Sequence, residues 1–183
     1  MSIDSFQFDA VEWGIQPIRE EHLPEIAEWI NAIGRHRGLN PNLIAAQMLN
    51  EHQIAVKGGY IDYYVGTRSG QLIFYFNGYC KDRKGALPGK IHKKKDYSLS
   101  LIVNTLVPGY AGFYAEIWFR VLFFVFQKPN VGRILTEIDP TDELLTKSLS
   151  KLGFHKMNKH EAPQYSPGWL VCNRTDFAPL AAL

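Results

Sequence analysis

The stretch of sequence that decides the fold runs from Leu101 to Phe113 and reads LIVNTLVPGYAGF. It predicts a strand ending near Val103, a turn with a proline and two glycines, and a long helix from about Gly112 to Gln127. The first N–H groups of a helix have no partner within it, and the helix dipole makes that end positive. The segment therefore suits a pyrophosphate-binding turn. A turn that merely connects two elements is the alternative, and the local sequence leaves both open.

The rest of the chain alternates expected strands and helices, without an internal repeat or a linker. Strands are expected at residues 11–18, 60–66, 72–79, 99–103, 133–138, from 154 onward and at 169–173, with residues 67–70 as a hairpin turn. Helices are expected to begin at Glu20, Asn42, Gly112 and Thr141. A helix between two strands implies a parallel crossover, whereas both chain ends form antiparallel meanders. The sequence therefore predicts one α/β (α+β) domain over residues 1–183, with a mixed, mostly antiparallel central sheet and helices on both faces.

Composition indicates an ordinary globular protein. Of 183 residues, 46% are hydrophobic and 21% charged, and a formal net charge of +2 is too small to indicate a nucleic-acid-binding face. Cys80 and Cys172 have neither metal-ligand nor disulfide spacing, so both are expected to be buried thiols. The six histidines also lack ligand spacing, and no metal site is expected.

Neither a signal peptide nor a membrane span is expected. The first ten residues, MSIDSFQFDA, lack a basic region and an apolar region. The most apolar stretch, Phe113 to Phe126, is short and is interrupted by Glu116 and Arg120. Its helical periodicity predicts a core helix instead, and the protein is expected to be cytoplasmic.

Two aspartates are candidates for moving a proton. Asp139 follows an expected strand, at the carboxyl edge where α/β sheets place ligands. Its alternative role is turn and capping chemistry beside Thr141 and Asp142. Asp96 precedes the strand that ends at Val103, where a partly buried carboxylate could act as a general base. Its alternative is a solvated loop aspartate beside the lysines at 93–95.

In this order, the features resemble the GNAT acetyltransferases (Gcn5-related N-acetyltransferases) from about Val11 to Phe177. The opening, from Ile15 to Asn31, is similar to the branch that contains siderophore-biosynthesis acyltransferases and aminoglycoside 6′-N-acetyltransferases. Further segments resemble, in turn, the family hairpin (65–79), the start of its fourth strand (96–100), its coenzyme A pyrophosphate turn (108–112), its K-x-G-F pattern (151–154) and the tail of this branch (174–177).

The resemblance implies an acyl-CoA-dependent N-acyltransferase, with acetyl-CoA as the expected co-substrate and a small-molecule amine or hydroxylamine, such as a siderophore precursor, as acceptor. An aminoglycoside-type N-acetyltransferase and a non-catalytic GNAT-like ligand- or partner-binding domain are the alternatives. No nucleic-acid or membrane partner is expected, and a homodimer is left open. The residues expected to bind the cofactor are Leu101, Ile102, Val103, Val107, Gly109, Tyr110, Ala111, Gly112 and Phe113.

Two positions depart from the family pattern. Leu106 stands where the family usually has Arg or Gln ahead of its pyrophosphate turn, and Ser100 stands where siderophore-type members tend to have a histidine. The resemblance therefore makes Asp96 the better candidate for the catalytic base, with Asp139 as the alternative that could serve the same role. It also implies direct transfer in a ternary complex, with the thioester oxygen polarised by a backbone N–H near residues 101–103.

Overall fold

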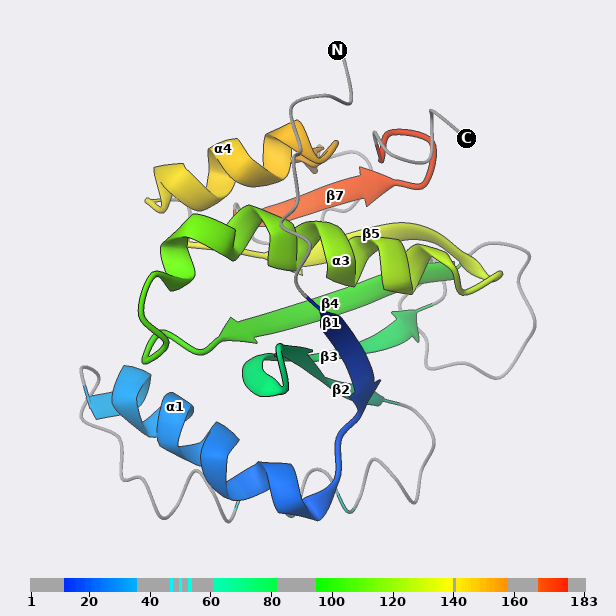
Figure 1. Ribbon diagram of the computed structural model, residues 1–183. Helices are drawn as coiled ribbons and strands as arrows, with labels where there is room; N and C mark the ends of the chain where they lie inside the picture. Colours follow the sequence, from blue (N-terminus) through cyan, green and yellow to red (C-terminus); the bar gives the residue numbers. More distant parts are fainter. Residues whose placement is uncertain are drawn as a thin grey trace. The chain divides into compact units, whose positions relative to one another are not determined.

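The computed structural model of the protein describes residues 12–35, 47, 50, 53, 61–81, 95–139, 141–157 and 168–177. Its strands form a seven-stranded sheet in the hydrogen-bonded order β1-β2-β3-β4-β5-β7-β6 (Figure 1). The strands are β1 (Trp13–Pro17), β2 (Asp62–Arg68), β3 (Gln71–Lys81), β4 (Lys95–Val103), β5 (Val131–Glu137), β6 (His155–Lys156) and β7 (Trp169–Asn173). The helices are α1 (Leu23–Arg35), α3 (Tyr114–Phe126) and α4 (Glu143–Lys151), with short 3₁₀ turns η2 (Glu20–His22) and η3 (Tyr110–Phe113).

The predicted fold class is confirmed. Strand β4 runs parallel to β5, whereas β1 with β2, β2 with β3, β5 with β7 and β6 with β7 pair in antiparallel fashion. Helix α3 is the crossover between the two parallel strands, as the helix between them predicted. The second predicted helix, from Asn42, lies outside the described residues except at positions 47, 50 and 53, which are helical.

Contacts divide the chain into two compact units, and β3 and β4 contribute residues to both. The α1 unit comprises the described residues of Asp9–Gly78 and Leu101–Gly112. The α3 unit comprises the described residues of Tyr79–Ser100 and Phe113–Leu183. The single domain expected over residues 1–183 stays a prediction.

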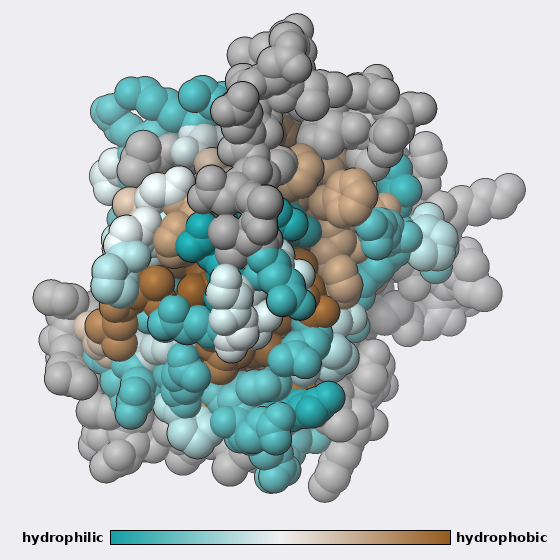
Figure 2. Space-filling model, viewed as in Figure 1, coloured by the Kyte–Doolittle hydropathy of each residue, from teal (hydrophilic) through white to brown (hydrophobic). Residues whose placement is uncertain are grey.

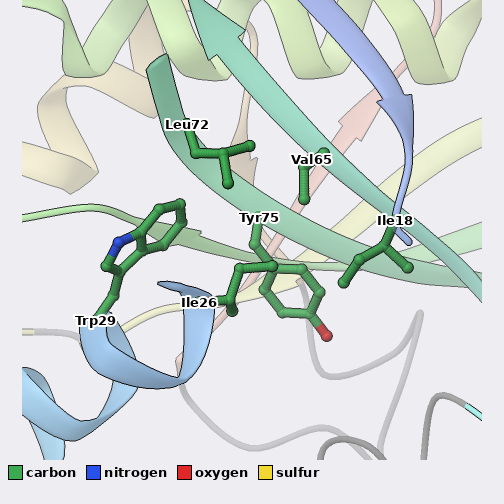
Figure 3. Packing of buried hydrophobic residues seen from close by; sticks show 6 residues of the cluster. All are labelled: Ile18, Ile26, Trp29, Val65, Leu72 and Tyr75. Atoms are coloured by element: carbon green, nitrogen blue, oxygen red, sulfur yellow. The ribbon is translucent and has the colours of Figure 1, made fainter. Parts of the chain in front are cut away.

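In the α1 unit, α1 packs an apolar side onto β2 and β3. Ile26 and Trp29 are buried and point toward Val65, Leu72 and Tyr75 (Figure 3). The other side of the helix carries exposed glutamates, and the corresponding lower part of Figure 2 is mostly hydrophilic. The helical spacing of the apolar residues thus predicted both the element and its buried side.

The β2–β3 hairpin is tighter than the sequence suggested. Its loop is only Ser69 and Gly70, with φ angles of 50° and 78°. Positive φ at both central residues is typical of a type I′ turn, whose twist matches that of the flanking strands. Thr67 and Arg68, expected in the turn, therefore belong to β2.

In the α3 unit, α3 contacts β5 and α4 (Figure 1). Ile117, Leu122 and Phe126 are fully buried, so the prediction that this is a core helix is confirmed. Phe123 is only half-buried and stacks on Phe119. Within the described residues, no helix is long and apolar enough to cross a membrane.

Candidate functional site

The turn that follows β4 is anchored by Asn104, whose side chain and backbone are buried. Its backbone N–H donates to the carbonyl of Ile73 at 2.7 Å, and its Nδ2 donates to that of Leu72 at 3.4 Å. The Asn104 Oδ1 accepts a hydrogen bond from the backbone N–H of Leu106 at 3.0 Å, and the Asn104 carbonyl accepts one from the backbone N–H of Val107 at 3.3 Å. One side chain therefore fixes the chain to β3 and shapes the first turn after the strand.

The following residues form the glycine-rich turn that leads into α3. Gly109 has a φ of 75°, and a Cβ atom there would meet nothing within 4 Å. The N–H groups of Tyr110 and Gly112 are used inside the turn, where they donate to the carbonyls of Val107 (3.2 Å) and Gly109 (2.9 Å). Within the described part of the chain, the N–H groups of Gly109 and Ala111 have no backbone acceptor. The turn can therefore offer donors to an anion, but from fewer residues than the sequence suggested.

The predicted cofactor-binding residues fall into two groups. Gly109, Ala111 and Gly112 are exposed, and Tyr110 and Phe113 are half-buried. Val103 and Val107 are buried, whereas Leu101 and Ile102 are half-buried, with Ile102 packed against the core of the α1 unit. The strand residues can therefore act on a ligand chiefly through their backbone, and the turn residues through their exposed surface.

The ladder between β4 and β5 ends before either strand does. The paired residues run from Lys95 opposite Val131 to Ser98 opposite Leu135. Although β4 continues to Val103 and β5 to Glu137, none of the described residues 99–103 pairs with β5. The last part of β4 thus has a backbone edge that β5 does not occupy.

Asp96 lies at the start of β4 and forms a buried ion pair. Nε of Arg133 donates to its Oδ1 at 2.9 Å, and Nη2 donates to its Oδ2 at 2.6 Å. The side chains of Arg133 and Asp96 are 16% and 8% exposed. Both carboxylate oxygens are thus bound by one guanidinium in a bidentate pair. The predicted role of Asp96 as a base stays a prediction.

Asp139 follows the end of β5 and is exposed. Its Oδ1 accepts from the N–H and the hydroxyl of Thr141, at 2.9 and 2.6 Å. Asp142 caps α4, with its Oδ1 accepting from the N–H of Leu145 at 2.9 Å, as the sequence allowed. Asp139 therefore shapes the turn before α4 while its carboxylate stays open to solvent.

The two predicted catalytic aspartates do not come together. Asp96 lies opposite Arg133, six residues before Asp139 along the chain. At about 3.3 Å per residue, six residues of extended chain span roughly 20 Å. Asp96 thus lies at the start of the parallel pair and Asp139 beyond its end, and which of them could act as the base stays a prediction.

Sequence reasoning missed the parts played by Asn104 and Arg133. An asparagine directly after a strand is a known turn former, so the local sequence did contain a signal for Asn104. Arg133 gave none, because its partner is 37 residues away. The lysines at 93–95, proposed as the alternative partners of Asp96, have side chains outside the described residues.

The two thiols differ in burial. Cys172 is buried on β7, and burial, with a smaller effect of the Asp176 carboxylate, raises its pKa to about 12. Cys80 is half-buried, not buried as expected. The described residues contain no group of three His, Cys, Asp or Glu side chains placed to hold a metal ion.

Solved structures identify the fold. The chain superimposes with a TM-score of 0.70 on an uncharacterized protein from Bacillus halodurans, at 14% identity over 94% of this chain and 89% of that one. The aminoglycoside acetyltransferase AAC(6')-Ib in complex with coenzyme A gives 0.68, at 17% identity over 93% and 99% of the two chains. The chain has the GNAT fold. The spermidine N-acetyltransferase from Vibrio cholerae, in complex with CoA and spermine, is similar too, with a TM-score of 0.68 and 12% identity over 91% and 98%.

These likenesses are structural, since no family model matches the chain and no curated protein is significantly similar to it in sequence. At such low identity they establish the GNAT fold and leave activity to be argued from the chain's own residues.

Proposed function

We propose that the protein is an acyl-CoA-dependent N-acyltransferase that uses acetyl-CoA to acylate a small-molecule amine or hydroxylamine. The supporting observation is the form of β4. Its ladder with β5 ends at Ser98, the strand continues to Val103, and an anchored glycine turn then leads into α3. Similar folds have been solved with coenzyme A and acetyl-CoA bound, in complexes of AAC(6')-Ib.

In this proposal, residues 107–113 hold the pyrophosphate of the cofactor. The N–H groups of Gly109 and Ala111 would donate to phosphate oxygens, supported by the positive end of the following helix. The open space around Gly109 lets a phosphate approach the backbone. Leu106, 57% exposed, stands where an Arg or Gln would add another donor, so binding would depend on the backbone.

The acyl end of the cofactor would lie along the unpaired edge of β4. A backbone N–H among Leu101 to Val103 would polarise the thioester oxygen, which gains negative charge as the acceptor nitrogen attacks. The new C–N bond forms, the C–S bond breaks, and the thiolate of coenzyme A leaves and takes up a proton. Holding the two reactants together supplies much of the acceleration.

The acceptor nitrogen must also lose a proton. A carboxylate or an ordered water can accept it, typically accelerating the step by about 10²–10⁴-fold. Asp139 is the more accessible candidate of the two, because it is exposed whereas Asp96 is buried. Asp96 would serve only if it released Arg133 first.

The identity of the acceptor is the most specific part of the proposal. A hydroxylamine of a siderophore precursor is proposed first, on the basis of the sequence resemblance. An aminoglycoside is the second candidate, because AAC(6')-Ib, which has the same fold, was solved with kanamycin. The basic composition of residues 34–40 and 81–95 disfavours a polycation. A homodimer and a cytoplasmic location stay predictions.

The proposal is tested by calorimetric titration with acetyl-CoA and desulfo-CoA, followed by mass spectrometry of acetylated products from N6-hydroxylysine, spermidine and kanamycin. We expect acetyl-CoA to bind and one class of amine to gain 42 Da, roughly the mass of an acetyl group less a proton. Binding without any product would support a non-catalytic domain. Absence of binding to either cofactor would refute the proposal.

A further inference from the structure

The ion pair between Asp96 and Arg133 lies where the position of β4 against β5 is decided. The register shifts at this point: Lys95 lies opposite Val131, but Asp96 lies opposite Arg133. Strand β5 therefore carries one extra residue, Gly132, as a β-bulge. The bulge puts the guanidinium, rather than a glycine, opposite the carboxylate.

The start of β5 is itself held firmly on its other side. Arg174 donates through Nη2 to the carbonyl of Lys128 at 2.6 Å and through Nε to that of Val131 at 3.0 Å. Its backbone N–H donates to the carbonyl of Gly132 at 3.0 Å. The Nζ of Lys128 lies 5.5 Å from the centre of the Tyr97 ring. Hydrogen bonds thus hold the backbone next to Arg133 in place. Asp96 is the β4 residue whose side chain binds Arg133.

A strand pair with so few paired residues needs an additional contact to fix its register. Among the described residues of β4, Lys95 to Ser98 pair with β5, and the strand continues to Val103 without that support. A slip of one residue would move the strand by about 3.3 Å and turn every side chain to the opposite face. Buried ion pairs are weak sources of net stability, and specifying a register is their best attested use.

We infer that Asp96 and Arg133 are positioning residues that fix the register of β4 on β5, and thereby the place of the backbone at residues 99–103. This inference rests on the proposed function for its catalytic meaning, since that backbone would bind the thioester. Neither side chain has to touch the substrate. The bidentate geometry, rather than the charge alone, carries the positioning.

The test replaces both charges by apolar side chains of similar size, in the double variant Asp96→Leu/Arg133→Met. A matched control is Glu116→Leu/Arg120→Met, which removes a similarly buried pair, 10% and 29% exposed, that lies within α3 and sets no strand register. Thermal unfolding first establishes that both variants fold. Amide hydrogen exchange of a peptide covering residues 99–104 is then compared with the wild type, and acetyl-CoA binding is titrated.

We expect exchange in residues 99–104 to be about tenfold faster in the first variant and unchanged in the control, because local opening becomes easier without the pair. Acetyl-CoA affinity should fall by about tenfold in the same variant. Unchanged exchange in a folded first variant would overturn the inference. If that variant does not fold, Arg133→Lys decides, because lysine keeps the charge but loses the fork; unchanged exchange there would likewise overturn it.

The proposed function and the positioning role of Asp96 and Arg133 can be refuted independently. Hydrogen exchange needs no ligand, so it decides the positioning role even if wild-type protein does not bind acetyl-CoA. That absence of binding would refute only the proposed function.

Discussion

The two ends of β4 are held in different ways. At its beginning, residues 95–98 pair with β5 and a buried ion pair joins the strands. At its end, β4 passes into Asn104, whose hydrogen bonds to β3 hold the backbone, and then into an exposed glycine turn. The first end is held by side chains, whereas the second leads into exposed turn residues. Under the proposed function, one half of the strand fixes geometry and the other half binds the cofactor.

The largest expected effect on stability comes from breaking the ion pair at the start of β4. Asp96→Asn removes the carboxylate that binds the Arg133 guanidinium, whose side chain is 16% exposed, so the free energy of unfolding should fall by about 3 kcal/mol. Urea denaturation measures this loss. Ser100→Ala, an exposed change on the same strand, is the control and should have little effect.

The same variant separates structure from catalysis at Asp96. If Asp96 is the base, the rate on a cationic amine falls by about 10²-fold and recovers partly at high pH. If the aspartate only positions β4, any loss of rate stays the same across that pH range. A rate equal to wild type in the folded variant would contradict both roles.

A smaller effect is expected where β4 passes into its turn. Asn104→Ala leaves the carbonyl of Leu72 and the N–H of Leu106 without their side-chain partner, which should cost about 2 kcal/mol of unfolding free energy. Thermal denaturation of this variant and of Thr105→Ala, an exposed neighbour, provides the measurement. Equal melting temperatures for the two variants would show that the turn does not depend on Asn104.

At the glycine turn that follows β4, a substitution should lower binding as well as stability. Gly109→Val places a β-branched residue at a φ of 75°, which costs about 1–2 kcal/mol in backbone strain, although nothing clashes with the added Cβ. Acetyl-CoA affinity, measured by calorimetry, should fall by about tenfold or more as the phosphate approach is blocked. Gly70→Val, at a φ of 78° and likewise with nothing within 4 Å of an added Cβ, is the matched control because it lies in the β2–β3 turn. Wild-type affinity in a folded Gly109→Val variant would remove residues 107–113 from the cofactor site.

The smallest effect concerns Cys172, which lies on β7 opposite Ile134 of β5. Its pKa is raised from 9.0 to about 12, so between these values the folded protein keeps a proton that the unfolded chain releases. The contribution of this thiol to the free energy of unfolding is therefore fully present below pH 9. It is lost as pH rises, by at most about 1.4 kcal/mol per pH unit. Urea denaturation at pH 8 to 10.5 should show a steeper decline for wild type than for Cys172→Ala. Parallel declines would mean that the thiol ionises as readily in the fold as outside it.

Local patterns predicted the elements that local forces determine. The apolar spacing in α1, the Asp142 cap of α4 and the glycine that ends α4, with a φ of 97° at Gly153, were all visible in the sequence. The start of β4 at Lys95 was not, because a polar lysine-rich stretch is typical of a loop. Pairing with neighbouring strands of the sheet makes it a strand.

The candidate site also contains features that local sequence predicted and features that it did not. The turn at Gly109 was predicted, since proline and glycine mark turns wherever they occur. The pairing of Asp96 with Arg133 was not, because it depends on a bulge at Gly132 and on the register of two distant segments. Local sequence therefore predicted the turn, but not the contacts that hold the neighbouring strand in place; ligand binding at the turn stays a prediction.

The early end of the β4–β5 ladder also bears on how the protein behaves in solution. An extended backbone edge that lacks a partner is a template on which another chain can add a strand, and such edges promote aggregation. In this protein the edge begins after Ser98, in the middle of a sheet rather than at its margin. A ligand that occupies the edge would also shield it, so concentrated samples should stay monodisperse longer with the ligand bound than without it.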